Sequence, residues 1–340
     1  MKLIILSIDG GGMRGIIPVQ FLNYIENKTQ KPIHQSFDLM AGTSTGALIV
    51  SALSTPQNNT GNALYHTADV EEIYYKHGSQ IFPEKNGFLN YIRNLFKPQF
   101  SAKGIEKVLK DKFNDVTIDN CLTPVFIPAY DNLLKTTVYF STRASRPDSF
   151  DYSKNYRLRD VCRATAAAPT YLPPYKMIIQ KESLEYEADL IDGGVFQNNP
   201  AMLAIAEIMK YKDDIPYGRR SNLQLEDIYV LSLGTGYHRG ITPGRKSHRW
   251  GQIKWAVPLI ELMMLGVSQA VHEQVAKLLP KGNYLRLNPS FEQKEKHKMN
   301  MTFSSKQTLD YWKNKANDFL DMEKNTLDEF LAKSGIMRKE

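Results

Sequence analysis

The chain has few of the features that mark secreted or membrane-spanning proteins. Only two of its 340 residues are cysteines, Cys121 and Cys162, which argues against a disulfide framework and for a reducing compartment. No apolar run approaches the roughly 18 residues that a bilayer-spanning helix needs. The apolar N-terminal stretch ends by Ser7 with no small-residue cleavage site after it, so we expect no signal peptide. These absences predict a cytoplasmic protein.

Strong charge of one sign is also missing. The net charge of +7 at pH 7 suits contact with anionic surfaces but is too mild to predict binding of nucleic acid, and we expect none. Repeats, low-complexity tracts and linkers do not appear, and 42% of the residues are hydrophobic, which is enough for a sizeable core. We therefore expect one folded unit, although the length alone would allow two domains.

Short apolar runs that are typical of buried strands alternate with helical segments along most of the chain. This alternation predicts an α/β protein. Beyond Tyr311 we expect a pair of charged helices on the exterior. The expected strands cover residues 3–8, 37–41, 124–129, 136–141, 185–191, 228–233 and 284–287.

The segment from Gly42 to Gly46, Gly-Thr-Ser-Thr-Gly, stands between an expected strand and an apolar helix. This is the context in which a G-x-S-x-G pentapeptide forms a nucleophile elbow. Such a turn is so tight that only glycine fits two residues before and two residues after the serine. It would place Ser44 Oγ at a helix N-terminus, where backbone N–H groups favour developing negative charge. An ordinary strand-to-helix turn that matches the short pattern by chance is the alternative.

A second glycine-rich loop, Gly10 to Gly15, follows the first expected strand and precedes a helix that we expect to begin at Ile16. Its spacing matches the dinucleotide fingerprint G-x-G-x-x-G, but residues 29–33 lack the acid expected about 20 positions later. The other interpretation is a row of bare amides, Gly10 to Gly12, that stabilises an oxyanion. If the first two strands are parallel neighbours, these amides and Ser44 face one crevice.

Arg14 lies within the same loop. Its side chain either anchors the loop or favours an anionic head group, and the alternative is an ordinary surface arginine.

Asp192 is the carboxylate that we expect to serve the serine. It follows the strand expected at residues 185–191, and Gly193 and Gly194 then turn the chain away. From this position it could take the proton of Ser44, and partial burial would raise its pKa usefully for a general base. The alternative is an aspartate that only forms the turn.

A serine–aspartate–histidine triad is the competing arrangement, because several histidines follow Asp192 in the chain. Its order is available, but an α/β-hydrolase builds several strands before its elbow, whereas only one β-α unit precedes Ser44. Most of the histidines lie in basic or polar runs, where this residue is usually a surface or capping group. Those after Asp192 are His238, His248, His272 and His297.

Two segments combine aromatic and basic side chains. Residues 88–100 form either a mobile flap at a lipid surface or a satellite of the core. Between Tyr237 and Ile260 there are five Lys/Arg, two tryptophans and no acid, and the stretch 255–267 is apolar. That mixture suits contact with an anionic interface, and a solvated basic loop before a core helix explains it as well.

Together these motifs resemble those of the patatin-like phospholipase family. Residues 9–15 match its D-G-G-G-x-R-G oxyanion loop, residues 42–46 its nucleophile elbow, and residues 192–194 its D-G-[GA] motif. Three motifs in this order are highly specific, and the similarity to plant patatins extends to about residue 290. Further similar stretches are residues 81–83, 167–174, 192–200, 231–236 and 283–287.

The resemblance implies a three-layer α/β/α fold with a central, mostly parallel sheet. We expect a phospholipase domain over residues 1–290 and a helical extension over residues 291–340 that packs on the same domain. The family further implies a dyad of Ser44 and Asp192 that hydrolyses acyl esters of membrane lipids without histidine, metal or cofactor. The implied oxyanion hole consists of Gly10, Gly11, Gly12, Arg14 and Gly15, and the supporting motif residues are Asp9, Gly42, Gly46, Gly193 and Gly194.

The same resemblance implies a phospholipid membrane or another lipid as partner, met at the surface of the membrane. Some bacterial relatives are cytosolic effectors that attack membranes once a nucleotide messenger or a host protein switches them on. A small-molecule or protein activator and a homo-oligomer therefore stay open. The alternative functions are a general carboxylesterase with a Ser-Asp-His triad and a non-enzymatic nucleotide-binding module.

Overall fold

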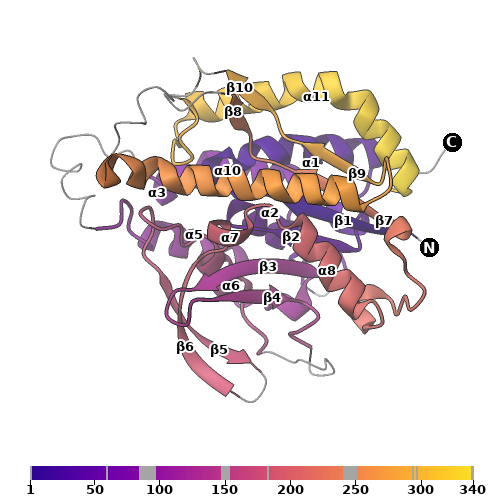
Figure 1. Ribbon diagram of the computed structural model, residues 1–340, viewed down its shortest axis with the longest axis horizontal. Coiled ribbons are helices and arrows are strands. Elements are labelled where there is room, and N and C mark those ends of the chain that lie inside the picture. Colours follow the sequence, from indigo (N-terminus) through magenta and orange to yellow (C-terminus); the bar gives the residue numbers. More distant parts are fainter. Residues whose placement is uncertain are drawn as a thin grey trace.

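The strands form one eight-stranded sheet with helices on both faces (Figure 1). The coordinates are a computed structural model that describes residues 2–337, except for 59, 84–96, 147–153, 182–183, 240–250, 293–294 and 296–297. The layers confirm the expected α/β/α architecture.

The sheet has the strand order β5-β6-β3-β2-β1-β7-β9, and β4 also pairs with β3. All neighbours from β3 to β9 in this order are parallel, whereas β4, β5 and β6 pair in antiparallel fashion. A separate parallel pair joins β8 and β10. The bounds are β1 Leu3–Ile8, β2 Leu39–Gly42, β3 Val125–Asp131, β4 Thr136–Ser141, β5 Tyr175–Lys181, β6 Leu184–Asp192, β7 Ile228–Leu233, β8 Tyr237–Arg239, β9 Tyr284–Leu287 and β10 Ser290–Glu292.

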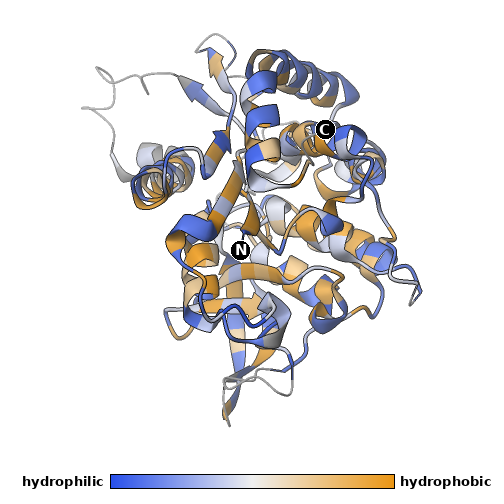
Figure 2. Cartoon of the chain, turned by 90° about the vertical axis from the view of Figure 1, so that its right-hand side faces the viewer, coloured by the Kyte–Doolittle hydropathy of each residue, from blue (hydrophilic) through white to orange (hydrophobic). Residues whose placement is uncertain are grey.

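The helices divide between two hydrophobic clusters, one on each face of the sheet. Helices α1, α2, α3, α5, α6 and α11 contribute to the larger cluster, and α8 and α10 to the smaller. Figure 2 shows mainly hydrophobic strands at the centre with helices to either side. The bounds are α1 Ile16–Thr29, α2 Thr45–Ser54, α3 Thr67–Ile81, α5 Lys103–Phe113, α6 Leu158–Thr165, α7 Gly194–Gln197, α8 Ala201–Tyr211, α10 Gln252–Leu278 and α11 Lys306–Ser334.

Strand β1 illustrates why both faces must be covered. Its side chains alternate between the faces, so that Leu3 and Ile5 belong to the cluster beneath α8 and α10, and Leu6 and Ile8 to the other. All four are fully buried. A strand that is apolar on both faces is typical of a parallel sheet between two helical layers.

Most expected elements are present, with differences in the C-terminal helix and in three strands. The chain beyond Tyr311 forms one helix, α11, rather than a charged pair, and one side of it is buried, including Leu309 and Trp312. Strands β5, β8 and β10 are not among the expected strands. Of the segment 88–100, only residues 97–100 are described, and Phe100 is buried.

Helix α11 packs against α1 in the larger cluster, and both Tyr24 and Lys28 of α1 bind Asp328 of α11, each at 2.7 Å. The division at residue 290 stays a prediction. Within the described part of the chain, no helix is long and apolar enough to span a bilayer.

Candidate active site

Ser44 occupies a sharp turn between β2 and α2. Its φ of 53° and ψ of −120° are unusual for a residue with a side chain. Backbone strain of this kind persists only where the surroundings impose it, and it concentrates at functional sites. Ser44 N–H donates to Thr165 Oγ1 at 3.1 Å, which helps to hold the turn. The side chain itself is largely buried, at 8% exposure.

The glycines on either side of the serine are required by close approach of backbone. A Cβ on Gly42 would lie 2.4 Å from the carbonyl of Gly46, and a Cβ on Gly46 would lie 2.2 Å from the carbonyl oxygen of Ile8 at the end of β1. Both distances are far below van der Waals contact. The G-x-S-x-G spacing therefore has the steric cause expected of an elbow.

The glycine loop lies beside this elbow because β1 and β2 are parallel neighbours, with Ile8 paired to Gly42. A Cβ on Gly10 would lie 3.2 Å from Ser44 Cβ. Gly10 N–H already donates to the carbonyl of Asn198 at 3.2 Å, whereas neither Gly11 nor Gly12 donates its N–H to any described residue. The free amides are thus those of Gly11 and Gly12. Gly15 instead lies against α3 and α2, where a Cβ would lie 2.1 Å from Tyr74 Oη.

Asp192 ends β6 and is buried, at 2% exposure. Gly194 N–H donates to its Oδ1 at 2.7 Å, while Oδ2 is buried and accepts no hydrogen bond of normal geometry from the described residues. Burial raises the pKa of Asp192 to about 6, and the nearby Ser44 hydroxyl and Gly194 N–H oppose that rise. The side chain is therefore a stronger base than an ordinary aspartate. The Ser44 hydroxyl is close enough to Asp192 to affect its pKa.

Sheet topology explains how Ser44 and Asp192 meet. Strand β4 occupies one edge of β3 from Phe126 to Asp131. On the other edge, β2 pairs with the start of β3 and β6 with its end, from Ala129 onward. Because β2 and β6 run in opposite directions along this shared edge, their carboxyl ends point at each other. The elbow after β2 thus faces the aspartate that ends β6.

A cavity of about 100 Å³ contains both side chains and the free amides of Gly11 and Gly12. Three of its lining residues, Ser44, Leu48 and Ala52, form one stripe along α2. This stripe is about 12 Å long at 1.5 Å per helical residue. The remaining wall is almost entirely apolar and includes Val70, Ile73, Ile81, Val108, Leu109, Phe113, Leu172 and Met264.

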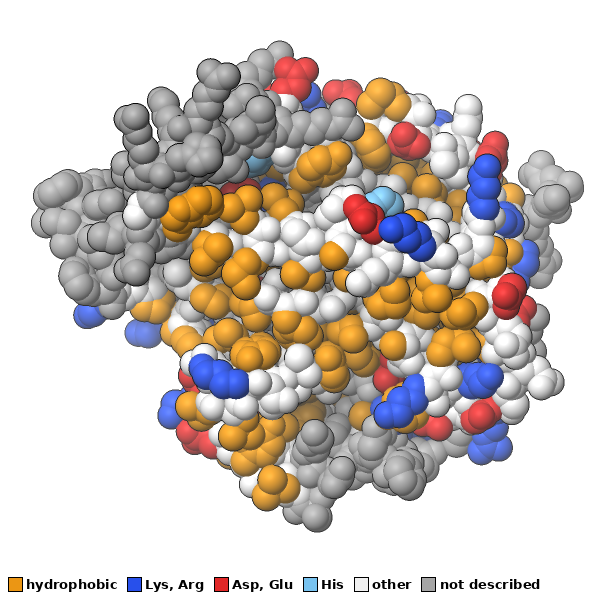
Figure 3. Space-filling view, viewed as in Figure 1, with side chains coloured by type: hydrophobic (Ala, Val, Ile, Leu, Met, Phe, Trp, Pro, Cys, Tyr) orange, Lys and Arg blue, Asp and Glu red, His pale blue; other side chains and the backbone are white. Residues whose placement is uncertain are grey.

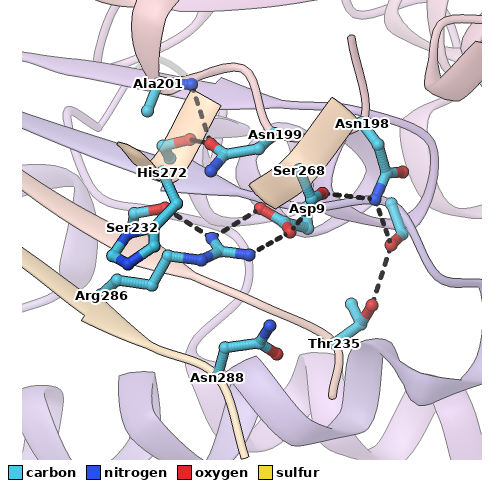
Figure 4. A network of polar contacts seen from close by, with 12 residues as sticks. Asp9, Asn198, Asn199, Ala201, Ser232, Thr235, Ser268, His272, Arg286 and Asn288 are labelled. Atoms are coloured by element: carbon cyan, nitrogen blue, oxygen red, sulfur yellow. Dashed lines mark hydrogen bonds and ion pairs between the residues drawn. The ribbon is translucent and has the colours of Figure 1, made fainter. Parts of the chain in front are cut away.

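A buried ion pair holds the start of the glycine loop (Figure 4). Arg286 of β9 donates to both carboxylate oxygens of Asp9, at 3.0 Å and 2.6 Å, and Ser268 of α10 donates to Oδ2 at 3.0 Å. Asn198 connects this pair to the loop by donating to Ser268 at 3.0 Å and to the Gly10 carbonyl at 3.4 Å. Thr235 donates to the same carbonyl at 2.8 Å.

Arg14 is not a surface arginine. It is 4% exposed, its Nε is buried without a hydrogen-bond partner in the described part of the chain, and burial lowers its pKa. Glu261 of α10 and Tyr171 oppose that shift. Arg14 lines a small polar cavity with Asp9 and Gly10 rather than the apolar cavity of Ser44.

None of the five histidines within the described ranges lines the cavity of Ser44. His272, for example, contacts Tyr284 through Nδ1 at 3.1 Å. Two of the triad candidates, His248 and His297, lie outside the described residues. Among the residues with described positions, no three His, Cys, Asp or Glu side chains are grouped to hold a metal ion.

Sequence reasoning did not single out Arg286, Asn198, Ser268 or Thr235. All four support the glycine loop from elements far away in the chain. The available signals were weak: an arginine in an otherwise apolar strand, and polar residues just after expected strands or helices.

Comparison with known proteins identifies the family. The model of the family described as patatin-like phospholipase matches residues 6–205. Patatin-like protein 1 of Oryza sativa subsp. indica is 33% identical over 309 residues, which cover 84% of this chain and 74% of that protein. Patatin-like protein 3 of Arabidopsis thaliana is 31% identical, with 84% and 73% covered.

A potato protein, "Probable inactive patatin-3-Kuras 1" of Solanum tuberosum, is 31% identical over 273 residues, which cover 76% of this chain and 70% of that protein. Among solved structures, VipD from Legionella pneumophila aligns with a TM-score of 0.39 and 13% identity, over 94% of this chain and 67% of VipD. The family model and the plant relatives place the protein: the chain belongs to the patatin-like phospholipase family of serine lipid acyl hydrolases.

Proposed function

We propose that the protein cleaves fatty-acyl esters of membrane phospholipids with a dyad of Ser44 and Asp192. Ser44 Oγ attacks the ester carbonyl carbon while its proton passes to the Asp192 carboxylate. As the C–O bond to the leaving alcohol breaks, Asp192 returns that proton to the alcohol oxygen, and the acyl group stays on Ser44. Water then attacks the acyl-enzyme, Asp192 takes its proton, and the fatty acid leaves as Ser44 regains a hydrogen.

The oxyanion that forms in both steps needs donors close to Ser44. We assign this role to the N–H groups of Gly11 and Gly12, which line the cavity of Ser44 and make no other hydrogen bond to the described residues. Preorganised donors of this kind contribute about 3 kcal/mol each to transition-state stabilisation. Arg14 would act on this site only indirectly, because it lies behind the loop in the neighbouring polar cavity.

The shape of the cavity supports a lipid acyl chain as substrate. Beyond the serine the walls from α2, α3 and α5 are mainly apolar: the hydroxyls of Thr45 and Tyr74 bond to each other, and Lys112 is the further polar residue that these helices contribute to the described lining. Such a wall gives no recognition to a peptide, whose amides need partners, but it removes the surface of a hydrocarbon chain from water. The observation that carries the proposal is this apolar cavity beginning at a strained serine beside a buried aspartate.

Release of fatty acid from phospholipid vesicles tests the proposal. Ser44→Ala should lower the rate at least about 1,000-fold, because it removes the oxygen that we propose forms the acyl-enzyme. Ser79→Ala, which changes an exposed serine of α3, is the matched control and should retain full activity. Wild-type rates in the Ser44→Ala protein would rule out the mechanism.

Three further experiments distinguish the proposed function from a catalytic triad, a nucleotide-binding module and a general esterase. A histidine variant as impaired as Ser44→Ala would favour a triad, and His248 and His297 are the first to replace. Saturable nucleotide binding without reaction of a serine-directed fluorophosphonate would favour the binding module. Faster turnover of short soluble esters than of long-chain phospholipids would favour a general esterase. Each reaction is run with and without candidate activators, since dependence on an activator is part of the hypothesis.

A further inference from the structure

Helix α10 presents two different surfaces to solvent along its length. Near its N-terminus the exposed side chains are large and apolar: Leu259 is 46% exposed, Leu262 38% and Met263 46%. Towards its C-terminus the exposed residues include Glu273 and Lys277. Figure 3 shows hydrophobic side chains over the left part of this helix and charged ones over its right part. Three exposed apolar side chains are therefore grouped in the N-terminal half, whereas a single one, Leu278 at 40% exposure, lies at the C-terminal end of the described helix.

The same half of α10 covers the active site with its opposite side. Met264 is buried and lines the cavity that contains Ser44, and Ser268 one turn later donates to Asp9. The apolar residues on the outside are thus separated from the catalytic cavity by the width of one helix, about 10 Å. Such an arrangement positions an exposed apolar surface where lipid must approach.

The sequence that precedes these apolar residues carries positive charge. From Tyr237 to Ile260 there are five Lys/Arg and no Asp/Glu, and this stretch includes Leu259 and is followed by Glu261, Leu262 and Met263. A basic stretch that adjoins apolar helical residues in the sequence is typical of segments that bind the interface of an anionic bilayer, through electrostatic attraction followed by apolar burial. A surface that only joins two copies of a protein has no need for such one-sided charge.

We propose that Leu259, Leu262 and Met263 form the surface by which this enzyme docks on an anionic phospholipid bilayer. The inference rests on the proposed function, because it assumes that the substrate is in the bilayer. In the docked state the apolar side chains enter the boundary between head groups and acyl chains. The cavity of Ser44 then lies next to the lipids that it hydrolyses, so that a substrate molecule leaves the bilayer over a short path.

Vesicle binding of the double variant Leu262→Gln/Met263→Gln tests this surface. Co-sedimentation with vesicles of phosphatidylcholine and phosphatidylserine should weaken at least about ten-fold relative to the wild type, because the apolar area that enters the bilayer is lost. Met322→Gln, on α11 and 74% exposed, removes an equally apolar side chain elsewhere and should bind as the wild type does. Hydrolysis of a soluble short-chain ester should be unchanged in both variants, which shows that the active site is intact.

The outcomes separate docking from catalysis. Unchanged vesicle binding of the double variant overturns the docking surface, as does wild-type binding that is equally strong on vesicles of phosphatidylcholine alone. A wild-type dimer in light scattering that the double variant abolishes would assign the surface to a second copy and also overturn the proposal. Vesicle binding that depends on Leu262 and Met263, but without release of fatty acid, supports the docking surface and contradicts the proposed function instead.

Discussion

Asp192 is a buried carboxylic acid, and burial destabilises its ionised form. Burial raises its pKa from 3.8 to about 6, which leaves most of the group ionised at neutral pH and able to accept a proton. We therefore predict that kcat/KM on a soluble ester rises as the pH increases through about 6 and then levels off. Asp192→Asn should remove this pH dependence along with most of the activity. A wild-type profile that is flat from pH 5 to 8 would contradict Asp192 as the base.

The same pKa shift predicts a gain in stability on mutation. A carboxyl whose folded-state pKa is raised stabilises the fold only while it is protonated, and this contribution is lost as the pH rises from its unfolded pKa through about 6. Asp192→Asn should therefore be more stable than the wild type, by about 3 kcal/mol at pH 8 and by less at pH 5. Thermal unfolding at the two pH values measures this difference. An aspartate that merely stabilised a turn would give a less stable variant.

Asp9 and Arg286 form a buried pair whose proposed role is to position the glycine loop. Arg286→Met would leave the Asp9 charge unpaired and should cost about 3–5 kcal/mol of stability. The double variant Asp9→Asn/Arg286→Met removes both charges and should recover most of this loss. If the pair positions the loop, kcat stays low in the double variant while stability returns, and KM changes little. Recovery of both kcat and stability would show a purely structural pair.

Helix α2 sets the direction of the proposed acyl site. The cavity follows its stripe from Ser44 through Leu48 to Ala52. Filling the far end should therefore exclude long chains without touching the reacting atoms. The sequence did not predict this direction, because residues 47–53 are apolar except for Ser51 and their pattern does not show which side of the helix lines a cavity.

We predict that Ala52→Phe lowers kcat/KM for long-chain acyl esters at least about ten-fold, because the blocked end leaves part of the chain in water. Activity on a butyryl ester should be unchanged. A series of esters with increasing chain length, measured on both proteins, locates the chain length at which the rates diverge. Parallel loss at every chain length would indicate a general packing defect rather than a shortened acyl site.

At the scale of the whole molecule, the C-terminal helix belongs to the core although its sequence is mostly charged. Its apolar positions lie on one side and pack with α1 in the larger cluster. The prediction of two solvated helices failed because charge on the outer surface masked this spacing. A boundary at residue 290 would therefore divide a continuous hydrophobic cluster.

A substitution at Trp312 tests whether α11 is part of the hydrophobic core. It is fully buried in the larger cluster, so Trp312→Ala should cost about 3–5 kcal/mol of unfolding free energy. Met322→Ala, at a site on the same helix that is 74% exposed, should change stability little. Chemical denaturation followed by circular dichroism gives both values. Equal stability of the two variants would show that α11 is a separable extension.

The sequence by itself determined the local geometry of this protein. The alternation of apolar runs predicted most strands, because burial on both faces of a parallel sheet demands continuous apolar segments. The glycine spacing predicted the elbow at Ser44, because close approach of backbone at Gly42 and Gly46 permits no side chain. These are properties of neighbouring residues, which a sequence displays directly.

Only the tertiary structure decided which distant groups meet. Strands β2 and β6 share one edge of β3 and run towards each other, and this alone brings Asp192 to Ser44 across almost 150 positions of chain. Likewise, the Asn198 carbonyl accepts a hydrogen bond from Gly10 N–H, whereas the N–H groups of Gly11 and Gly12 make none to the described residues, and Arg286 binds Asp9. Strand order and pairing register set these contacts, and they depend on the packing of the whole sheet rather than on any local pattern.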